Sequence, residues 1–290
     1  MYRTYSVSRF LGLLLLDAFI FSVCGIFFLV FVSSADSREE AAVTLPVLMY
    51  HSVCNGEPTE YRVTPEQLES DLEWLSENGY KSVTAAEVTA YANSRGDLPE
   101  KPVMITFDDG YYNNLAYALP LLEKYDMTAV VSVVGEYTDK DAAADPHVPS
   151  YSYLTWEDIG ELSDSGRVEI GAHTYAMHSL YSGRKGCGKL AGEYEQEYRD
   201  ALSEDIRLQQ EGFKEHLGYV PTVFAYPFGN VSRESVPVLR ENGYLMTLTC
   251  RELPNRITHD PDCLYGIGRF NRSGLYSTEE YMSEIMGLSD

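Results

Sequence analysis

Seven short apolar runs, separated by segments with helical spacing, constrain the fold of this 290-residue chain more than any other feature. The runs are Val43–Tyr50, Val103–Phe107, Ala129–Val134, Val168–Ala172, Val223–Ala225, Leu245–Thr249 and Leu264–Ile267. Several are apolar throughout, as expected for strands buried on both faces. Strands that alternate with helices across short loops form parallel sheets. The pattern therefore predicts an α/β fold, a distorted (β/α)7-type barrel of mostly parallel strands.

Capping signals mark where the helices begin. Thr64 can cap a helix that has Pro65 in its first position and Gln67 placed to complete a capping box, and Asn78-Gly79 ends that helix. Other helices are expected to begin at Thr155, near Glu193 and at Ser277. The longest carries apolar residues at helical spacing, which we interpret as a core stripe: Tyr194, Tyr198, Leu202 and Ile206.

A different apolar segment lies near the N-terminus. From Phe10 to Val32 the chain is apolar over 23 residues, interrupted chiefly by Asp17. At about 1.5 Å per residue, this length spans a bilayer core of about 30 Å. Arg3 and Arg9 precede the segment and acidic residues follow it, so the positive-inside rule places the N-terminus in the cytoplasm.

The domain organisation follows from that segment. We expect residues 1–35 to form a cytoplasmic tip and one transmembrane signal-anchor helix, 36–44 a linker, and 45–290 an α/β domain. The protein would then be a single-pass protein of the cell membrane with its domain on the extracytoplasmic side. The alternative is a signal peptide cleaved near Ser33-Ser34-Ala35, which would give a secreted protein.

Charge and cysteine content exclude some functions. The formal net charge is −22, and the sequence contains no block of Lys or Arg, so a nucleic-acid partner is not expected. Four cysteines lie beyond the apolar segment at spacings unlike those of a zinc ribbon, and they allow three disulfide pairings among which the sequence cannot choose. They are Cys54, Cys187, Cys250 and Cys263.

Two adjacent carboxylates, Asp108 and Asp109, follow the run Val103–Phe107 and precede Gly110. Neighbouring side chains on a regular strand point to opposite faces, so both acids reach one site only if the chain bends. Gly110 permits such a bend. An ordinary Asp-Gly turn is the alternative interpretation.

His173 and His178 follow the apolar run that ends at Ala172. Two residues five apart lie about 140° apart around a helix, whereas in a loop they can converge on one ion. Together with Asp109 they would supply two imidazoles and a carboxylate and leave positions open for water and substrate. Ordinary hydrogen-bonded histidines remain the alternative. A third strand end, Phe224–Gly229, reads by itself as a turn held by proline and glycine.

These three strand ends, in this order, resemble the polysaccharide deacetylase family, the NodB-homology domain of carbohydrate esterase family 4. The matching segments are Thr106–Gly110, His173–His178 and Ala225–Phe228. Leu48–Ser52 and the stretch through Thr84 are similar to the branch that includes exported poly-N-acetylglucosamine deacetylases. The resemblance covers roughly residues 45–286, with the motif core at about 100–290.

The resemblance implies a metal-dependent hydrolase that removes N-acetyl groups from a cell-surface or cell-wall polysaccharide. Asp109, His173 and His178 would bind a divalent cation, with zinc expected first and cobalt, nickel or iron as alternatives. Asp108 would act as the general base, and the backbone N–H of Phe228 would help to stabilise the oxyanion.

The sequence departs from the family pattern in three places. The two histidines are separated by four residues instead of three, a wider form that the same branch shares. Ala225 stands where many members carry an Arg that orients the base, and Arg269 is the candidate to replace it. No Leu-x-His occurs near the C-terminus, so His51 is the candidate general acid because an imidazole titrates near neutral pH. His259 reads as a loop residue.

An N-acetylated polysaccharide is the expected substrate, and no protein partner is predicted. Residues beside the motifs are candidates for contact with sugar rings, with core packing as the alternative for each. They are Tyr111, Tyr175, Tyr226 and Pro227. Two other functions stay open: a peptidoglycan-specific deacetylase, and a membrane-anchored carbohydrate-binding pseudoenzyme without activity.

Overall fold

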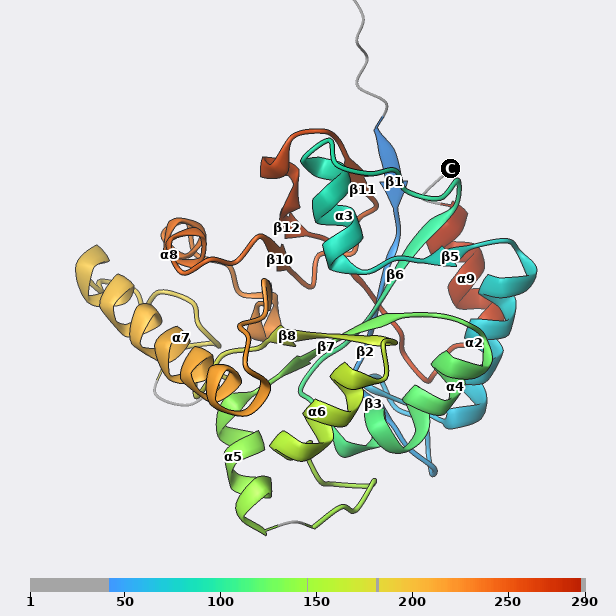
Figure 1. Cartoon of the computed structure of the whole chain (residues 1–290), viewed down its shortest axis with the longest axis horizontal. Coiled ribbons are helices and arrows are strands. Elements are labelled where there is room, and N and C mark those ends of the chain that lie inside the picture. Colours follow the sequence, from blue (N-terminus) through green and yellow to red (C-terminus); the bar gives the residue numbers. More distant parts are fainter. Residues whose placement is uncertain (1–41, 145, 181–182, 288–290) are drawn as a thin grey trace, which may run out of the picture. The chain divides into compact units, whose positions relative to one another are not determined.

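A nine-stranded parallel sheet forms the centre of the molecule in a computed structural model that describes residues 42–144, 146–180 and 183–287 (Figure 1). The strands are β1 (Val43–Leu45), β2 (Val47–Tyr50), β3 (Ser52–Val53), β4 (Arg62–Val63), β5 (Lys81–Ser82), β6 (Pro102–Phe107), β7 (Ala129–Val133), β8 (Val168–Ala172), β9 (Val223–Ala225), β10 (Met246–Leu248), β11 (Asn255–Ile257), β12 (Tyr265–Ile267) and β13 (Phe270–Asn271). The α-helices are α2 (Pro65–Glu77), α3 (Ala85–Ala92), α4 (Leu119–Lys124), α5 (Gly135–Ala144), α6 (Trp156–Asp164), α7 (Glu195–Leu217), α8 (Ser235–Glu241) and α9 (Thr278–Gly287). Three short helical turns complete the set: η1 (Asn114–Ala118), η2 (Pro227–Gly229) and η3 (Pro261–Leu264).

The main sheet has the order β12-β10-β9-β8-β7-β6-β2-β13, and β5 pairs with β6. All of its pairs are parallel. The two ends of this order, β12 and β13, are separated in the chain only by Gly268 and Arg269. Three residue steps span at most about 11 Å, so the sheet must curl until its ends lie near each other. The expected parallel α/β architecture is confirmed, but as a curled, open sheet instead of a closed seven-stranded barrel.

All seven expected strands are present. Pro46 divides the first of them, because proline lacks the N–H that a continuous ladder needs: β1 pairs with β11 in an antiparallel pair, while β2 enters the main sheet. β5 and β13 are additional members that the apolar pattern did not mark.

The helix signals are also confirmed. Thr64 and Gln67 form a complete capping box at the start of α2, and Thr155 does the same for α6 with Asp158. In α7, Tyr198 and its successors in the stripe are buried, but Tyr194 is the N-cap and is 75% exposed, so its assignment to the core stripe was wrong.

The strands are buried on both faces, and their side chains alternate between two cores. One core contains Leu48, Ile105 and Val131 and packs against α2, α4, α6, α7, α8 and α9. The other contains Val47 and Met104 and packs against α3. Burial on both faces explains why the strand sequences are apolar throughout.

The pairing register brings the carboxyl ends of the central strands to one rim. Tyr50 pairs with Phe107, Phe107 with Val131, and Val133 with Ala172. Ala172 in turn pairs with Phe224. The residues that follow these strands therefore meet at the same edge, where parallel α/β proteins place their functional sites.

Residues Val43–Asp290 form one compact unit. The expected membrane segment, Phe10–Val32, lies outside the described residues. Among the residues that are described, no helix has both the length and the apolar character needed to cross a membrane. The cysteines beyond that segment, Cys54, Cys187, Cys250 and Cys263, are all unpaired.

Candidate metal and catalytic site

Asp108 and Asp109 end strand β6 at a sharp turn. The Asp108 amide still continues the ladder, donating to the Tyr50 carbonyl at 2.9 Å, but Asp109 and Gly110 both adopt left-handed conformations, with φ of +71° and +68°. The bend expected at Gly110 therefore begins one residue earlier, at Asp109. A Cβ at position 110 would lie 2.9 Å from the Val133 side chain, so the turn requires glycine. Because of this turn, both carboxylates line the same pocket.

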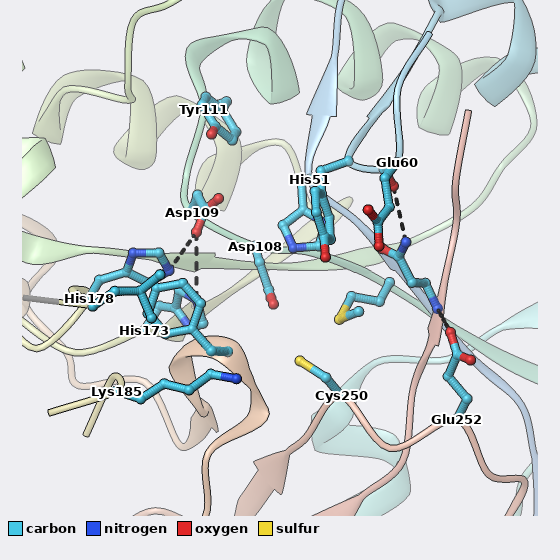
Figure 2. Close-up of a pocket in the computed structure, with 15 residues that line it drawn as sticks. His51, Glu60, Asp108, Asp109, Tyr111, His173, His178, Lys185, Cys250 and Glu252 are labelled. Atoms are coloured by element: carbon cyan, nitrogen blue, oxygen red, sulfur yellow. Dashed lines mark hydrogen bonds and ion pairs between the residues drawn. The ribbon is translucent and has the colours of Figure 1, made fainter. Parts of the chain in front are cut away.

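Asp109, His173 and His178 converge at this rim (Figure 2). The Nε2 atoms of His178 and His173 lie 3.1 and 3.6 Å from Asp109 Oδ1, and ligand atoms of all three residues lie within 4.8 Å of one another. These three residues were expected to form one set, and the structure brings them together.

Hydrogen bonds on the far side of each imidazole orient its Nε2 atom toward Asp109. His173 Nδ1 lies 2.7 Å from the Ala225 carbonyl, which can only accept, so Nδ1 carries the proton and Nε2 is left with a lone pair. The Tyr137 hydroxyl donates to the His178 carbonyl at 3.2 Å and lies 3.4 Å from His178 Nδ1. Because its proton is used by the carbonyl, the hydroxyl oxygen faces Nδ1 as an acceptor, which favours a proton on His178 Nδ1. Such outer partners are typical of metal-binding histidines.

The arrangement of these three side chains suits the binding of a divalent cation better than an ion pair between Asp109 and the histidines. The 3.1 Å separation of His178 and Asp109 would suit a hydrogen bond, yet Asp109 Oδ1 is buried and accepts no hydrogen bond from the described residues. Three acceptor atoms that face one another need a cation between them. Two imidazoles and a carboxylate are the donor set of open, catalytic zinc-type sites.

The electrostatic environment favours the protonation states that metal binding requires at Asp109 and His173. Burial lowers the pKa of His173, which keeps this imidazole neutral. Burial would raise the pKa of Asp109, but His178, His173 and His51 together lower it. Burial would lower the pKa of His178, but the Asp109 carboxylate outweighs it and raises that pKa. A cation that binds here would therefore compete with a proton for His178.

Asp108 forms a buried, bidentate ion pair with Arg269. The two guanidinium nitrogens Nη1 and Nη2 donate to the two carboxylate oxygens at 2.7 Å each, and the side chains are 2% and 0% exposed. Burial alone would raise the pKa of Asp108, but Arg269, with His173 and His51, holds it well below its usual range. Asp108 is therefore ionised at neutral pH, as a general base must be.

The fold explains how Arg269 reaches this place. Arg269 lies in the two-residue connection between β12 and β13, the two ends of the curled sheet, and its side chain reaches the end of β6. Its Nε donates to the Thr249 carbonyl at 2.9 Å, and Nη1 also donates to the Thr106 hydroxyl at 3.2 Å. The expected contact between Arg269 and Asp108 is thus present.

His51 follows β2 and lines the same pocket, on the other side of Asp108 from the two metal-type histidines (Figure 2). Its carbonyl accepts a hydrogen bond from Asn114 at 3.1 Å, and its ring lies edge-on to Tyr61 at 5.1 Å. His51 Nδ1 is buried without a hydrogen-bond partner among the described residues. The ring therefore lies against Tyr61 at the pocket wall.

The turn η2 places Phe228 at the pocket wall. The Tyr226 amide donates to Leu248, Pro227 has no N–H, and the Gly229 and Asn230 amides donate back within the turn. None of these bonds uses the Phe228 amide. Phe228 has a φ of +56°, and its ring lies 4.7 Å from that of His178. A bulky residue in this conformation is strained, and such strain is concentrated at functional sites.

These groups surround a cavity of about 590 Å³. Its lining residues are Met49, His51, Glu60, Tyr61, Asp108, Asp109, Tyr111, His173, His178, Leu180, Lys185, Phe228, Cys250, Glu252 and Asn271. Tyr111 is the only one of the four expected substrate-contact residues that is part of this lining.

The other three expected substrate contacts do not line this pocket. Tyr226 is 0% exposed, and its hydroxyl lies against Ser235 in the core. Pro227 is buried inside η2. The Tyr175 hydroxyl donates to Asp139 on α5 instead of facing the pocket. All three are close to the motifs in sequence, but their side chains point elsewhere.

Several pocket residues had no signal in the sequence. Lys185, Cys250 and Glu252 come from loops, and Glu60 from the turn before β4. Because loops follow no hydrophobic period, only the folded arrangement identifies these side chains.

Acidic and imidazole side chains that converge in a pocket at the carboxyl ends of a parallel sheet define an enzyme active site. The chain belongs to the polysaccharide deacetylase family, whose sequence model matches residues 95–247. The family expected from the motifs is thereby confirmed, and with it the assignment of the chain as a deacetylase.

Individual relatives agree with this family. The putative polysaccharide deacetylase YxkH of Bacillus subtilis is 29% identical over 217 residues, covering 75% of this chain and 68% of that protein. The poly-beta-1,6-N-acetyl-D-glucosamine N-deacetylase of Escherichia coli K12 is 29% identical over 205 residues, which are 64% of this chain but only 30% of that protein. The structure of IcaB from Ammonifex degensii aligns with a TM-score of 0.70 and 26% identity, covering 86% of this chain and 98% of that one.

Proposed function

We propose that this chain removes N-acetyl groups from a poly-β-1,6-N-acetylglucosamine-type polymer in a metal-dependent hydrolysis, with zinc as the first candidate metal. The observation that carries the proposal is the ionised Asp108, fixed by Arg269, beside the converging Asp109, His173 and His178. Relatives in Escherichia coli, Staphylococcus epidermidis and Staphylococcus aureus are named poly-beta-1,6-N-acetyl-D-glucosamine N-deacetylases, which supports this substrate class.

The bound cation would be held by Asp109, His173 and His178 and would supply Lewis acidity toward an acetamide carbonyl and lower the pKa of water. Asp108 accepts the proton of the attacking water, since its carboxylate is ionised and anchored. Arg269 orients Asp108 and keeps it charged. The Phe228 amide donates to the oxygen on which negative charge develops.

The leaving amine needs a proton, and His51 is the candidate donor. It lies at the same rim, on the side of Asp108 opposite the metal-type triad, which suits a reaction in which base and acid act on different sides of the scissile bond. Tyr111 stacks on Tyr153 at 5.1 Å and offers an aromatic face at the pocket wall, a surface that packs well against a sugar ring.

We also propose that the domain acts outside the cytoplasmic membrane, tethered by the apolar segment Phe10–Val32 or released after its cleavage. Such a position would bring the pocket to surface polysaccharides. Recovery of the full-length chain among cytosolic proteins, and not with membranes or in the medium, would contradict this part of the proposal.

The function is tested by measuring acetate release from oligomers of β-1,6-linked N-acetylglucosamine and from peptidoglycan. We expect release from the oligomers, a loss of at least about 100-fold after treatment with a chelator, and recovery when zinc is added back. Cobalt, nickel and iron are added in parallel to identify the preferred metal. Release from peptidoglycan alone would instead favour a cell-wall enzyme, and binding without release under every metal would favour a pseudoenzyme.

A second prediction concerns His51. A general acid must be protonated to act, so activity should fall on the alkaline side as this acid is titrated. We expect His51→Gln to lower kcat/KM by about 10²-fold or more and to remove the alkaline limb of the pH–rate profile. An unchanged alkaline limb in His51→Gln would show that another group protonates the amine.

A further inference from the structure

The backbone between His173 and His178 is held from two sides. On one side, the amides of Gly135 and Glu136 at the start of α5 donate to the carbonyls of Thr174 and Tyr175, at 3.1 and 2.9 Å. A Cβ at Gly135 would lie 2.5 Å from the Tyr175 ring, so glycine allows the loop to approach α5 this closely. Two carbonyls of this loop are thereby satisfied without any metal ion.

On the other side, the Asp205 carboxylate accepts the amides of the same loop. The Tyr175 amide donates to Oδ2 at 2.7 Å and the Ala176 amide to Oδ1 at 2.8 Å. Asp205 belongs to α7 and is only 6% exposed. It lies on the buried face of that helix with Leu202 and Ile206, so the packing of the α7 stripe determines the position of its carboxylate.

This loop needs such support for two reasons. Thr174 has a φ of +69°, a left-handed conformation that is unfavourable for a β-branched residue. The two histidines are also separated by four residues, so the loop has more conformations to lose than the shorter family form. Without fixed partners, His178 would be free to move away from Asp109.

We propose that Asp205 is a positioning residue that orders the loop between the two histidines, so that the three metal-type ligands converge before any metal binds. The inference rests on the proposed metal-dependent function. It adds that a carboxylate 27 residues beyond His178 positions the ligands of the site. This carboxylate, that of Asp205, does not line the pocket. Preorganised ligands bind a cation without first losing conformational entropy.

The first test uses the wild-type protein without metal. Hydrogen exchange of the Tyr175 and Ala176 amides should be at least about 100-fold slower than in an unstructured chain, because both amides donate to a buried carboxylate. Addition of zinc should change this protection little. Fast exchange without metal, followed by strong protection once zinc is added, would mean that the metal orders the loop, and the proposal would be overturned.

The second test compares two carboxylate variants. Asp205→Asn turns one of the two acceptor oxygens into an NH₂ donor, so the Tyr175 and Ala176 amides can no longer each donate to an oxygen of its own. Asp158→Asn is the matched control, because Asp158 is also 6% exposed and also accepts a backbone amide, that of Thr155, but caps α6 away from the pocket. We expect the zinc dissociation constant to rise about 10–100-fold in Asp205→Asn and to stay within about twofold of wild type in Asp158→Asn.

Further readouts separate positioning from a purely structural role. The absorption spectrum of the cobalt-substituted protein should change in Asp205→Asn and not in Asp158→Asn. If both variants lose thermal stability and both bind zinc as the wild type does, Asp205 is only a structural cap. If the wild type itself binds no zinc, the proposed metal-dependent function fails, while the exchange experiment still decides whether Asp205 orders the loop.

Discussion

Asp108→Asn is expected to lower turnover by about 10²–10⁴-fold while zinc binding remains close to that of the wild type. The carboxylate is the group that accepts a proton, and an amide of nearly the same shape cannot do so. The pKa of Asp108 is held low by the bidentate Arg269, so the wild-type base is ionised throughout the neutral range. Asp108 is outside the triad that could hold the metal, so its substitution removes proton transfer and leaves the ligands in place.

The measurement pairs acetate release with a zinc titration on the same samples. Asp109→Asn and His178→Ala serve as the opposite controls, because each removes a proposed ligand and should lose zinc as well as activity. An Asp108→Asn protein that retains most of its turnover would exclude Asp108 as the base. A His178→Ala protein that binds zinc as the wild type does would exclude the proposed ligand set.

The sheet was predictable because strands buried on both faces must be apolar throughout. Such runs are conspicuous in a sequence, and all seven expected runs form strands. β5 and β13 were missed because each has only two residues, and β5 is polar, Lys81-Ser82. Their membership of the sheet depends on backbone pairing with β6 and β2, which no pattern of side chains records.

The main catalytic candidates were predictable for a related reason. Asp108, His173 and His51 each follow a buried strand, and parallel strands in register bring their carboxyl ends to one rim. The alternation of side chains along a strand explains why Tyr226 does not reach the pocket. Ala225 packs in the core on the α3 side, so its neighbour Tyr226 points to the opposite face and joins the core there.

Residues that position other residues could not be recognised from the local amino-acid sequence. Asp205 and Tyr137 lie on helices and hold the loop of the two histidines from the outside. In the sequence, Asp205 is one acidic residue among many on an acidic chain, and its contacts depend on how α7 packs. Arg269 could be named as a candidate, but its contact with Asp108 depends on the curling of the whole sheet.

Arg269→Met is expected to lower the free energy of unfolding by about 3–5 kcal/mol, because it leaves the Asp108 carboxylate buried without its partner. Both side chains are almost fully inaccessible to solvent, so water cannot replace the lost guanidinium. The folded-state pKa of Asp108 lies below that of an exposed Asp, so the pair stabilises the fold at neutral pH and this contribution is lost as the pH falls. Chemical denaturation followed by the fluorescence of Trp74 and Trp156 measures the loss.

The same substitution should change the pH dependence of catalysis. Burial raises the pKa of Asp108, and without the neighbouring cation this effect is no longer outweighed. The acidic limb of the kcat/KM profile should therefore move to higher pH, so that activity lost at neutral pH partly returns in alkaline buffer. An uncharged Met cannot orient the carboxylate either, so the maximum should stay below that of the wild type.

Arg272→Met is the matched control for this prediction. Arg272 forms an equally buried ion pair with Asp71, its Nε donating at 2.7 Å, but neither residue lines the pocket. We expect a similar loss of stability and no movement of the acidic limb. If both variants moved the limb equally, the shift would report a general loosening of the fold. If Arg269→Met alone moves the limb, Arg269 sets the charge state of the base. The connection between β12 and β13 then supplies the arginine that many family members carry at the position of Ala225.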